Sequence, residues 1–275
     1  MAEVTAALIR SVREITGAGM SDVKKALIQA EGVVDTAVEE LRKKGAAKAI
    51  KRGAERSTSN GLVAAAEGAI IELACETDFV AKNEQFQGLA NDIVAHAART
   101  RTSDLTALLS EKLVDGKTVA DNITDMQAVL GEKIELRRVA VFDGQVASYM
   151  HRRASDLPPQ IGVLVEFEGS DEGAARGAAM QVSAMRAQYL SREEVPAELV
   201  ENERRIAEET AKEEGKPEQA LPRIIEGRVN GFFKEVVLLE QGSVQPDAGK
   251  KTVRQVLDDA GVTVKRFARF EVGSA

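Results

Sequence analysis

The residues best suited to do chemistry gather in one short stretch, Cys75-Glu76-Thr77-Asp78-Phe79-Val80-Ala81-Lys82-Asn83. Paired carboxylates can serve as acid and base in glycoside hydrolysis. Glu76 and Asp78, however, have no histidine near them in the sequence. A small hydrolase built on these two carboxylates therefore has no further support.

Asp78 and Phe79 allow two interpretations. In the structural one, Asp78 is the N-cap of the helix that follows and Phe79 folds back onto that helix as a hydrophobic staple. In the functional one, a phenylalanine facing solvent beside an aspartate enters a pocket of a partner protein. The spacing alone favours the structural interpretation, although a loop between a buried strand and an amphipathic helix is a common place for function.

The sequence offers little support for a metal site, a nucleotide-binding motif or a catalytic histidine. The chain has two histidines, His96 and His151, and no group of Cys and His with the spacing of metal ligands. His96 lies beside an apolar helical stripe, which predicts a structural role. Gly17-Ala18-Gly19 begins like a dinucleotide-binding motif, but it lacks the third glycine and follows a helix. We therefore expect no catalytic residues, no metal ion and no cofactor, as in a protein that is not an enzyme.

Composition sets broader limits. The chain has 275 residues, enough for two or three domains, with 44% hydrophobic and 29% charged residues. Its single cysteine excludes an intrachain disulfide, and no apolar run reaches the ~18 residues of a membrane span. The net charge of −7 argues against a general nucleic-acid-binding surface. With no signal peptide at its start, the chain is expected to be cytoplasmic, with no membrane and no direct nucleic-acid partner.

The first part of the chain, residues 1–55, predicts a unit of three short helices followed by a basic linker. From Arg42 to Arg56, seven basic residues accompany a single acid, Glu55. This run is either a solvated linker or a docking segment for an acidic surface such as RNA. The second option is the basis of an alternative function, an RNA-binding translation accessory protein.

The rest of the chain predicts two α+β subdomains, at 56–140 and at 141–186 with 228–275. A turn at Glu67-Gly68 joins two predicted strands, and the residues from Phe86 to Ala97 have strong helical periodicity. Residues 88–98 resemble residues 177–187 weakly, which suggests an internal repeat. The remaining predicted elements are strands at 134–141, 146–150 and 161–167, a helix at 171–187, a helix capped near Thr252 and an extended segment at 262–272.

Between the two parts of the second subdomain, residues 187–227 predict an antiparallel helical hairpin. Ser191-Arg192-Glu193-Glu194 has the form of a capping box and is expected to open its first helix. Gly215-Lys216-Pro217 supplies the turn. An ordinary pair of surface helices and a protruding arm that meets another protein both fit this pattern.

Several motifs together resemble the elongation factor Ts family over almost the whole chain. They are the stretch Cys75–Asn83, Arg13–Met20 with Lys24–Leu27, Glu226–Arg228 through Lys234–Val236, and Arg269–Gly273. The resemblance implies a guanine-nucleotide exchange factor for elongation factor Tu, the GTPase that delivers aminoacyl-tRNA. It also implies an α+β fold with an N-terminal ubiquitin-associated-like (UBA-like) three-helix domain, two related α+β core subdomains and an inserted antiparallel coiled coil.

The same resemblance implies which residues contact elongation factor Tu, in its GDP-bound and nucleotide-free forms. The segment that approaches the bound magnesium is matched by Thr77, Asp78, Phe79 and Val80. The contact of the N-terminal domain is matched by Thr16, Gly17, Ala18, Gly19 and Met20. A contact of the second core subdomain is matched by His151. A homodimer through the core or the hairpin stays open.

Two departures from the family pattern follow. A longer insert, Arg152 to Pro159, separates His151 from Ile161. The chain also ends three residues after Glu271-Val272, so the contact of a C-terminal helical module found in some relatives is expected to be lost or replaced.

Overall fold

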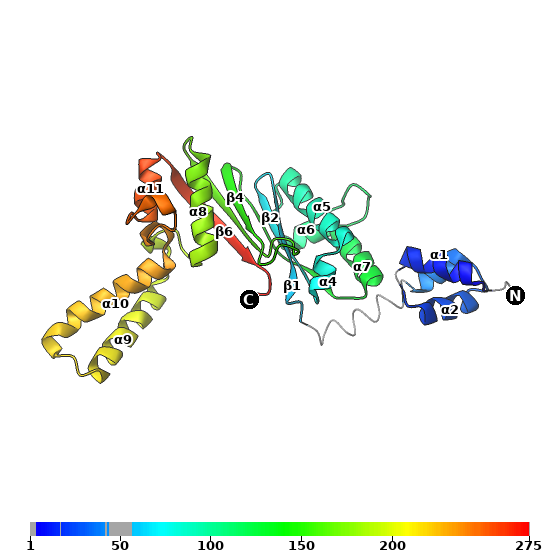
Figure 1. The fold of residues 1–275 in the computed structure, drawn as a ribbon, viewed down its shortest axis with the longest axis horizontal. Helices are drawn as coiled ribbons and strands as arrows, with labels where there is room; N and C mark the ends of the chain where they lie inside the picture. The colour runs from blue at the N-terminus through cyan, green and yellow to red at the C-terminus, as the bar shows by residue number, and fades with distance from the viewer. Residues whose placement is uncertain (1–3, 17, 42, 44–56, 275) are drawn as a thin grey trace. The chain divides into compact units, whose positions relative to one another are not determined.

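The computed structural model describes residues 4–16, 18–41, 43 and 57–274. It divides into two compact units, which are described separately here. Unit 1 consists of Met1–Val141, Arg152–Ile161 and Phe270–Ala275, and unit 2 of Phe142–His151 and Gly162–Arg269. The mixture of helices and small sheets in Figure 1 confirms the predicted α+β class. The finer division into four domains stays a prediction.

The N-terminal residues form short helices around a small core of their own. These are α1 (Ala6–Thr16), α2 (Met20–Gln29) and a helical stretch at 34–41. Their buried side chains form one cluster of apolar residues: Val12, Val23, Ala26, Leu27, Ala30, Ala37 and Leu41. Gly32 follows α2 with a φ of 85°, and its N–H donates to the Leu27 carbonyl (2.8 Å), which turns the chain after the helix.

The first sheet, in unit 1, has the strand order β1-β2-β3, and both strand pairs are antiparallel. Its strands are β1 (Asn60–Ala66), β2 (Ala69–Cys75) and β3 (Ile134–Val141). The predicted hairpin is confirmed, because Ala66 pairs with Ala69 around the two-residue turn. Glu67 and Gly68 both have positive φ (41° and 87°), as tight hairpin turns require.

One face of this sheet packs against α5 (Glu84–Thr100), the helix that the periodicity predicts. Phe86, Ile93 and Ala97 of α5 are completely buried. Three more helices belong to unit 1, namely α4 (Asp78–Ala81), α6 (Leu105–Ser110) and α7 (Val119–Leu130). The short helix α4 therefore lies between the last residue of β2 and the start of the main helix of the unit.

The other face of the sheet holds a buried carboxylate. Glu72 is completely buried in β2 between two residues that face α5, so it points to the opposite side. Arg138 of β3 pairs with one of its two oxygens, with Nε 2.6 Å from Oε2. The Nη2 of Arg138 also donates to the carbonyl of Glu271 (2.9 Å), near the end of the chain. This pair fixes the segment 270–274 to unit 1.

Unit 2 contains the second sheet, with the strand order β4-β5-β6. Its strands are β4 (Gln145–His151), β5 (Ile161–Glu168) and β6 (Thr263–Glu271), and its helices include α8 (Glu172–Met185) and α11 (Val253–Asp259). Small and β-branched side chains of α8 and the sheet make one core cluster, which includes Ala175, Ala179, Val182, Val163 and Val165. Thr252 is the N-cap of α11, as predicted, and it forms a capping box with Gln255.

Two long helices follow α8, and they pack against each other as a hairpin (Figure 1). They are α9 (Ala197–Glu213) and α10 (Leu221–Val236), with short 3-10 helices at Arg192–Glu194, Glu218–Ala220, Leu238–Glu240 and Pro246–Ala248. The predicted capping box at Ser191 is wrong, since Ser191 makes no capping bond and α9 begins after Pro196. Glu194 turns back instead and accepts a hydrogen bond from the N–H of Leu190 (2.8 Å).

Candidate functional site

The segment 77–80 forms one turn of helix, α4, directly after β2. The residue that caps α4 is Thr77, whose Oγ1 accepts a hydrogen bond from the N–H of Val80 (3.3 Å). The prediction that Asp78 is the N-cap is therefore wrong, because Asp78 is already the first helical residue. Thr77 keeps the extended backbone typical of an N-cap, with φ −123° and ψ 159°.

A second contact fixes the same threonine from a distant part of the chain. The carboxylate of Glu132 accepts hydrogen bonds from the Thr77 N–H (3.0 Å) and from its hydroxyl (2.6 Å). The neighbouring Glu76 makes two more hydrogen bonds. Its carboxylate accepts one from the N–H of Lys133 (2.8 Å), and its carbonyl accepts one from the side chain of Asn60 (2.8 Å). Glu76 thus stabilises the loop through these hydrogen bonds. Its role is structural, and it does not act as an acid or a base.

Phe79 points into solvent, whereas its neighbour Val80 is buried. Phe79 is 77% exposed and Val80 is 2% exposed. The prediction of a hydrophobic staple is therefore wrong, since the phenylalanine does not fold back onto the helix. Val80 fixes the turn from the inside, and Phe79 is presented by backbone that is already ordered. Ordering before binding lowers the entropy cost of association.

Charged groups flank Phe79 on the outer side of α4. The Nζ of Lys82 is 3.2 Å from Asp78 Oδ2 and 2.7 Å from Asp156 Oδ2. The hydrogen bond to Asp156, and after it the one to Asp78, raises the pKa of Lys82 above its ordinary value. The hydrogen bond from Lys82 in turn lowers the pKa of Asp156. These three residues form a charged cluster with a formal charge of −1, beside the exposed phenylalanine.

The cysteine at the start of the loop cannot act as a nucleophile. Cys75 is completely buried, and its thiol donates a hydrogen bond to the Thr77 carbonyl (3.2 Å). Burial, and after it the negative charge of Glu132, raises the pKa of Cys75 to about 12. The thiol therefore stays protonated at neutral pH, and the reactive thiolate is not formed.

The roles of three residues that support this segment, Glu132, Lys82 and Asp156, were not identified from the sequence. Glu132 follows α7 and lies 55 residues from Thr77, so no local pattern indicates the contact. Lys82 is different, because a lysine four residues after an aspartate on a helix is a recognisable ion-pair spacing. Asp156 belongs to the insert 152–159, for which no role is predicted from the sequence.

The predicted N-terminal contact residues lie at the junction of α1 and α2. The hydroxyl of Thr16 donates to the Val12 carbonyl (2.6 Å) and accepts from the Ala18 N–H (3.3 Å). Gly19 is the N-cap of α2 with an ordinary φ of −62°, and Met20 is 61% exposed. Gly17 lies outside the described residues. The junction thus presents an exposed thioether on a turn that Thr16 stabilises.

The two histidines have different surroundings. His151 is exposed at the end of β4, and its Nδ1 is 3.5 Å from the Tyr149 hydroxyl. His96 is buried between Glu111 (2.6 Å from Nε2) and Arg99 (2.7 Å from Nδ1). Because arginine can only donate, Nδ1 accepts and the ring proton lies on Nε2. His96 therefore has the structural role that the sequence predicts.

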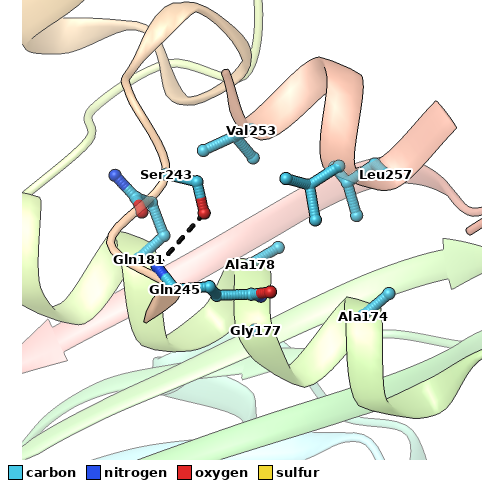
Figure 2. A pocket seen from close by; sticks show the side chains of 9 residues that line it. Ala174, Gly177, Ala178, Gln181, Ser243, Gln245, Val253 and Leu257 are labelled. Atoms are coloured by element: carbon cyan, nitrogen blue, oxygen red, sulfur yellow. Dashed lines mark hydrogen bonds between the residues drawn. The ribbon is translucent and has the colours of Figure 1, made fainter. Parts of the chain in front are cut away.

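A small hollow in unit 2 does not extend the site. Figure 2 shows it between α8 and α11, lined by apolar side chains such as Ala178 and Leu257, with Gln181 at its edge. In the same view the Ser243 hydroxyl accepts a hydrogen bond from the N–H of Gln245 (3.2 Å). Its free volume of about 10 Å³ is what a single water needs. The hollow is too small for a nucleotide or a metabolite.

The part of the chain that the structure describes offers no metal-binding cluster and no helix that could span a membrane. Within residues 4–16, 18–41, 43 and 57–274, no group of three or more His, Cys, Asp or Glu side chains is arranged to hold a metal ion. In the same ranges, no helix combines the length and apolar character needed to cross a bilayer.

Comparison with known proteins agrees with the motifs around α4. The sequence model of the family described as Elongation factor TS matches residues 76–274, which include the segment 77–80. A protein named Elongation factor Ts from Nocardia farcinica is 60% identical over 278 aligned residues. Proteins of the same name from Mycolicibacterium gilvum and Mycobacterium tuberculosis are each 59% identical over 275 residues. All three alignments cover 100% of both chains. With the family match covering most of its length and relatives this similar from end to end, the chain belongs to the elongation factor Ts family of translation elongation factors.

Proposed function

We propose that this chain is the guanine-nucleotide exchange factor of elongation factor Tu. In this proposal it binds the GDP-bound GTPase, displaces Mg²⁺ and the nucleotide, and allows GTP to bind. The single observation that supports it most is Phe79, 77% exposed on a helical turn that Thr77 and buried Val80 hold in place. We call Thr77–Val80 the exchange segment.

The chemistry of the GTPase explains what the exchange segment has to do. GTPases hold GDP through its phosphates and through a Mg²⁺ ion that neutralises their charge. In our proposal Phe79 enters between elements of the GTPase near the nucleotide, and Asp78 disturbs the groups or waters that hold Mg²⁺. Because coupling between two ligands is reciprocal, a factor that weakens GDP binding must itself bind more tightly once GDP has left.

Two further contacts are part of the proposal. The junction of α1 and α2, formed by Thr16, Gly17, Ala18, Gly19 and Met20, serves as a second binding surface for elongation factor Tu. The exposed Met20 supports this, since a flexible thioether adapts well to a partner surface. His151 contributes a contact from unit 2. No step of this mechanism breaks a covalent bond, so the protein acts without catalytic residues, metal or cofactor of its own.

The alternative of an RNA-binding accessory protein has no support from the described residues. It depends on the basic run 42–56, of which only Lys43 is described, and Lys43 is paired with Glu39 at 2.6 Å. Dimerisation through the core or the helical hairpin stays a prediction.

The proposal is tested by the release of fluorescent GDP from elongation factor Tu in a stopped-flow instrument. We expect the chain to accelerate release in a concentration-dependent manner, and excess GTP to complete the exchange. Val114, which is 93% exposed in the loop between α6 and α7, offers a matched control. The variant Val114→Ala should accelerate release as well as the wild type does. An unchanged rate of GDP release in the presence of the wild-type chain would contradict the proposal.

A further inference from the structure

Lys82 lies between two carboxylates, and only one of them belongs to the exchange segment. Asp78, one helical turn earlier, is 3.2 Å from the lysine Nζ, whereas Asp156 is 2.7 Å from it. The shorter contact is therefore made by the insert 152–159. The side chains of all three residues remain accessible, with exposed fractions of 36% for Lys82, 60% for Asp78 and 65% for Asp156.

The insert that provides Asp156 is attached on both sides of this residue to other parts of unit 1. Before Asp156, the guanidinium of Arg153 pairs with the carboxylate of Glu271. After it, the Pro159 carbonyl accepts a hydrogen bond from the N–H of Val63 in β1 (2.8 Å). Asp156 is thus placed next to α4 by contacts that do not involve the exchange segment.

The placement of Lys82 decides how much negative charge Asp78 presents. A lysine paired with Asp78 alone would neutralise the carboxylate that the proposed mechanism uses. A lysine shared with a second and closer carboxylate leaves a net charge of −1 on the cluster. The lysine ammonium is a compact point charge on a flexible stem, so it follows the nearer carboxylate. Asp78 then keeps more of its charge, together with oxygen atoms available to accept hydrogen bonds.

We propose that Asp156 and Lys82 are positioning residues for the exchange reaction, in which Asp156 shares Lys82 with Asp78 and so keeps part of the negative charge of the Asp78 carboxylate available to the magnesium site of the GTPase. This inference rests on the function proposed above and adds a role for the insert 152–159. The competing explanation is that the ion pair only attaches the insert to α4.

The first test removes the charge of Asp156. In the variant Asp156→Asn, Lys82 pairs with Asp78 alone, and stimulated GDP release should slow about two- to fivefold, the range expected of one exposed ion pair. Asp156→Glu keeps the charge and should restore release. A matched control is Asp259→Asn, because Asp259 pairs with Lys251 at 2.7 Å with similar exposure on unit 2. The control should leave the rate unchanged.

The second test separates positioning from attachment. The double variant Lys82→Gln with Asp156→Asn removes the cation that pairs with Asp78 among the described residues, so release should return to the wild-type rate. If the ion pair only attaches the insert, the double variant should be at least as slow as Asp156→Asn. A wild-type rate for Asp156→Asn, or no recovery in the double variant, would overturn the inference.

The outcome also distinguishes this inference from the function on which it rests. If the wild-type chain accelerates GDP release and Asp78→Ala slows it, while Asp156→Asn does not, then only the role of Asp156 is wrong. If the wild-type chain does not accelerate release at all, both the proposed function and the role of Asp156 are wrong.

Discussion

Replacing Phe79 by alanine is the most direct test of the exchange segment. Complete burial of a phenylalanine contributes about 1.5–3 kcal/mol. Since 77% of this side chain is still exposed in the chain alone, roughly three quarters of that amount, about 1–2 kcal/mol, is available when it enters a partner. Each ~1.4 kcal/mol is a factor of ten in rate. If burial occurs mainly in the transition state of exchange, Phe79→Ala should slow stimulated GDP release roughly five- to thirtyfold.

The same variant should leave the stability of the chain almost unchanged. An exposed side chain contributes little to the folded state, so the free energy of unfolding should change by less than about 0.5 kcal/mol. Val80→Ala is the informative contrast, because Val80 is 2% exposed in the core of unit 1. Its loss of two buried methyl groups should cost about 1.5–2 kcal/mol. Urea denaturation followed by circular dichroism measures both values.

One combination of results would refute the proposed entry of Phe79 into the partner. If Phe79→Ala lowers thermal stability but stimulates GDP release as well as the wild type does, the phenylalanine supports the fold and does not enter the partner. Val114→Ala, at a residue that is 93% exposed away from α4, controls for a general effect of removing surface apolar area. Both variants should be compared at several concentrations, so that weaker binding and slower release are distinguished.

Three further predictions concern other parts of the chain. Asp78→Ala should slow GDP release in the presence of Mg²⁺, and the defect should shrink when Mg²⁺ is chelated; an equal defect under both conditions would exclude action through the metal. Deletion of residues 1–55 should weaken binding to elongation factor Tu in titration calorimetry and leave the rest folded; equal affinity would contradict the second binding surface. The hydrogen bond from Arg266 lowers the pKa of Glu166 below its ordinary value of 4.5, so its stabilisation is present above that pH and is lost as the pH falls through the lowered pKa. Glu166→Gln should therefore lower the free energy of unfolding at pH 7 by less than about 1 kcal/mol. It should also reduce the stability that the chain loses on acidification, as urea titrations at pH 7 and at a pH below the lowered pKa of Glu166 would measure.

Elements with strong local patterns could be predicted from the sequence. The periodicity from Phe86 to Ala97 corresponds to the buried face of α5, and the expected strand at 134–141 has the same bounds as β3. The turn at Glu67-Gly68 was predictable because Gly68 accepts a positive φ between two apolar segments, although Glu67, at 41°, is an uncommon residue for that conformation. In each case the pattern that predicts the element lies within a short stretch of the sequence, even where the element pairs with a distant strand, as β3 does with β2.

The predictions that were wrong concern caps, for which neighbouring residues compete. Thr77 and Asp78 are both good N-cap residues, and burial of Val80 and the contact with Glu132 select Thr77. Ser191 has the pattern of a capping box, but Pro196 fits the start of a helix and delays α9 to residue 197. Tertiary contacts select the N-cap at Thr77, and the backbone preference of proline sets the start of α9. Neither effect can be recognised from the short capping motif alone.

The support of Phe79 also indicates which kinetic parameter each part of the chain should control. The cap at Thr77, its contact with Glu132 and the buried Val80 all lie within unit 1. An exposed side chain on such ordered backbone loses little entropy when it enters a partner, so more of its burial energy lowers the barrier to GDP release. The junction of α1 and α2 is ordered around its own small core and has no hydrogen bond to the exchange segment among the described residues. Changes at that junction should therefore alter the concentration of factor needed for half-maximal exchange, whereas changes around Phe79 should alter the maximal rate.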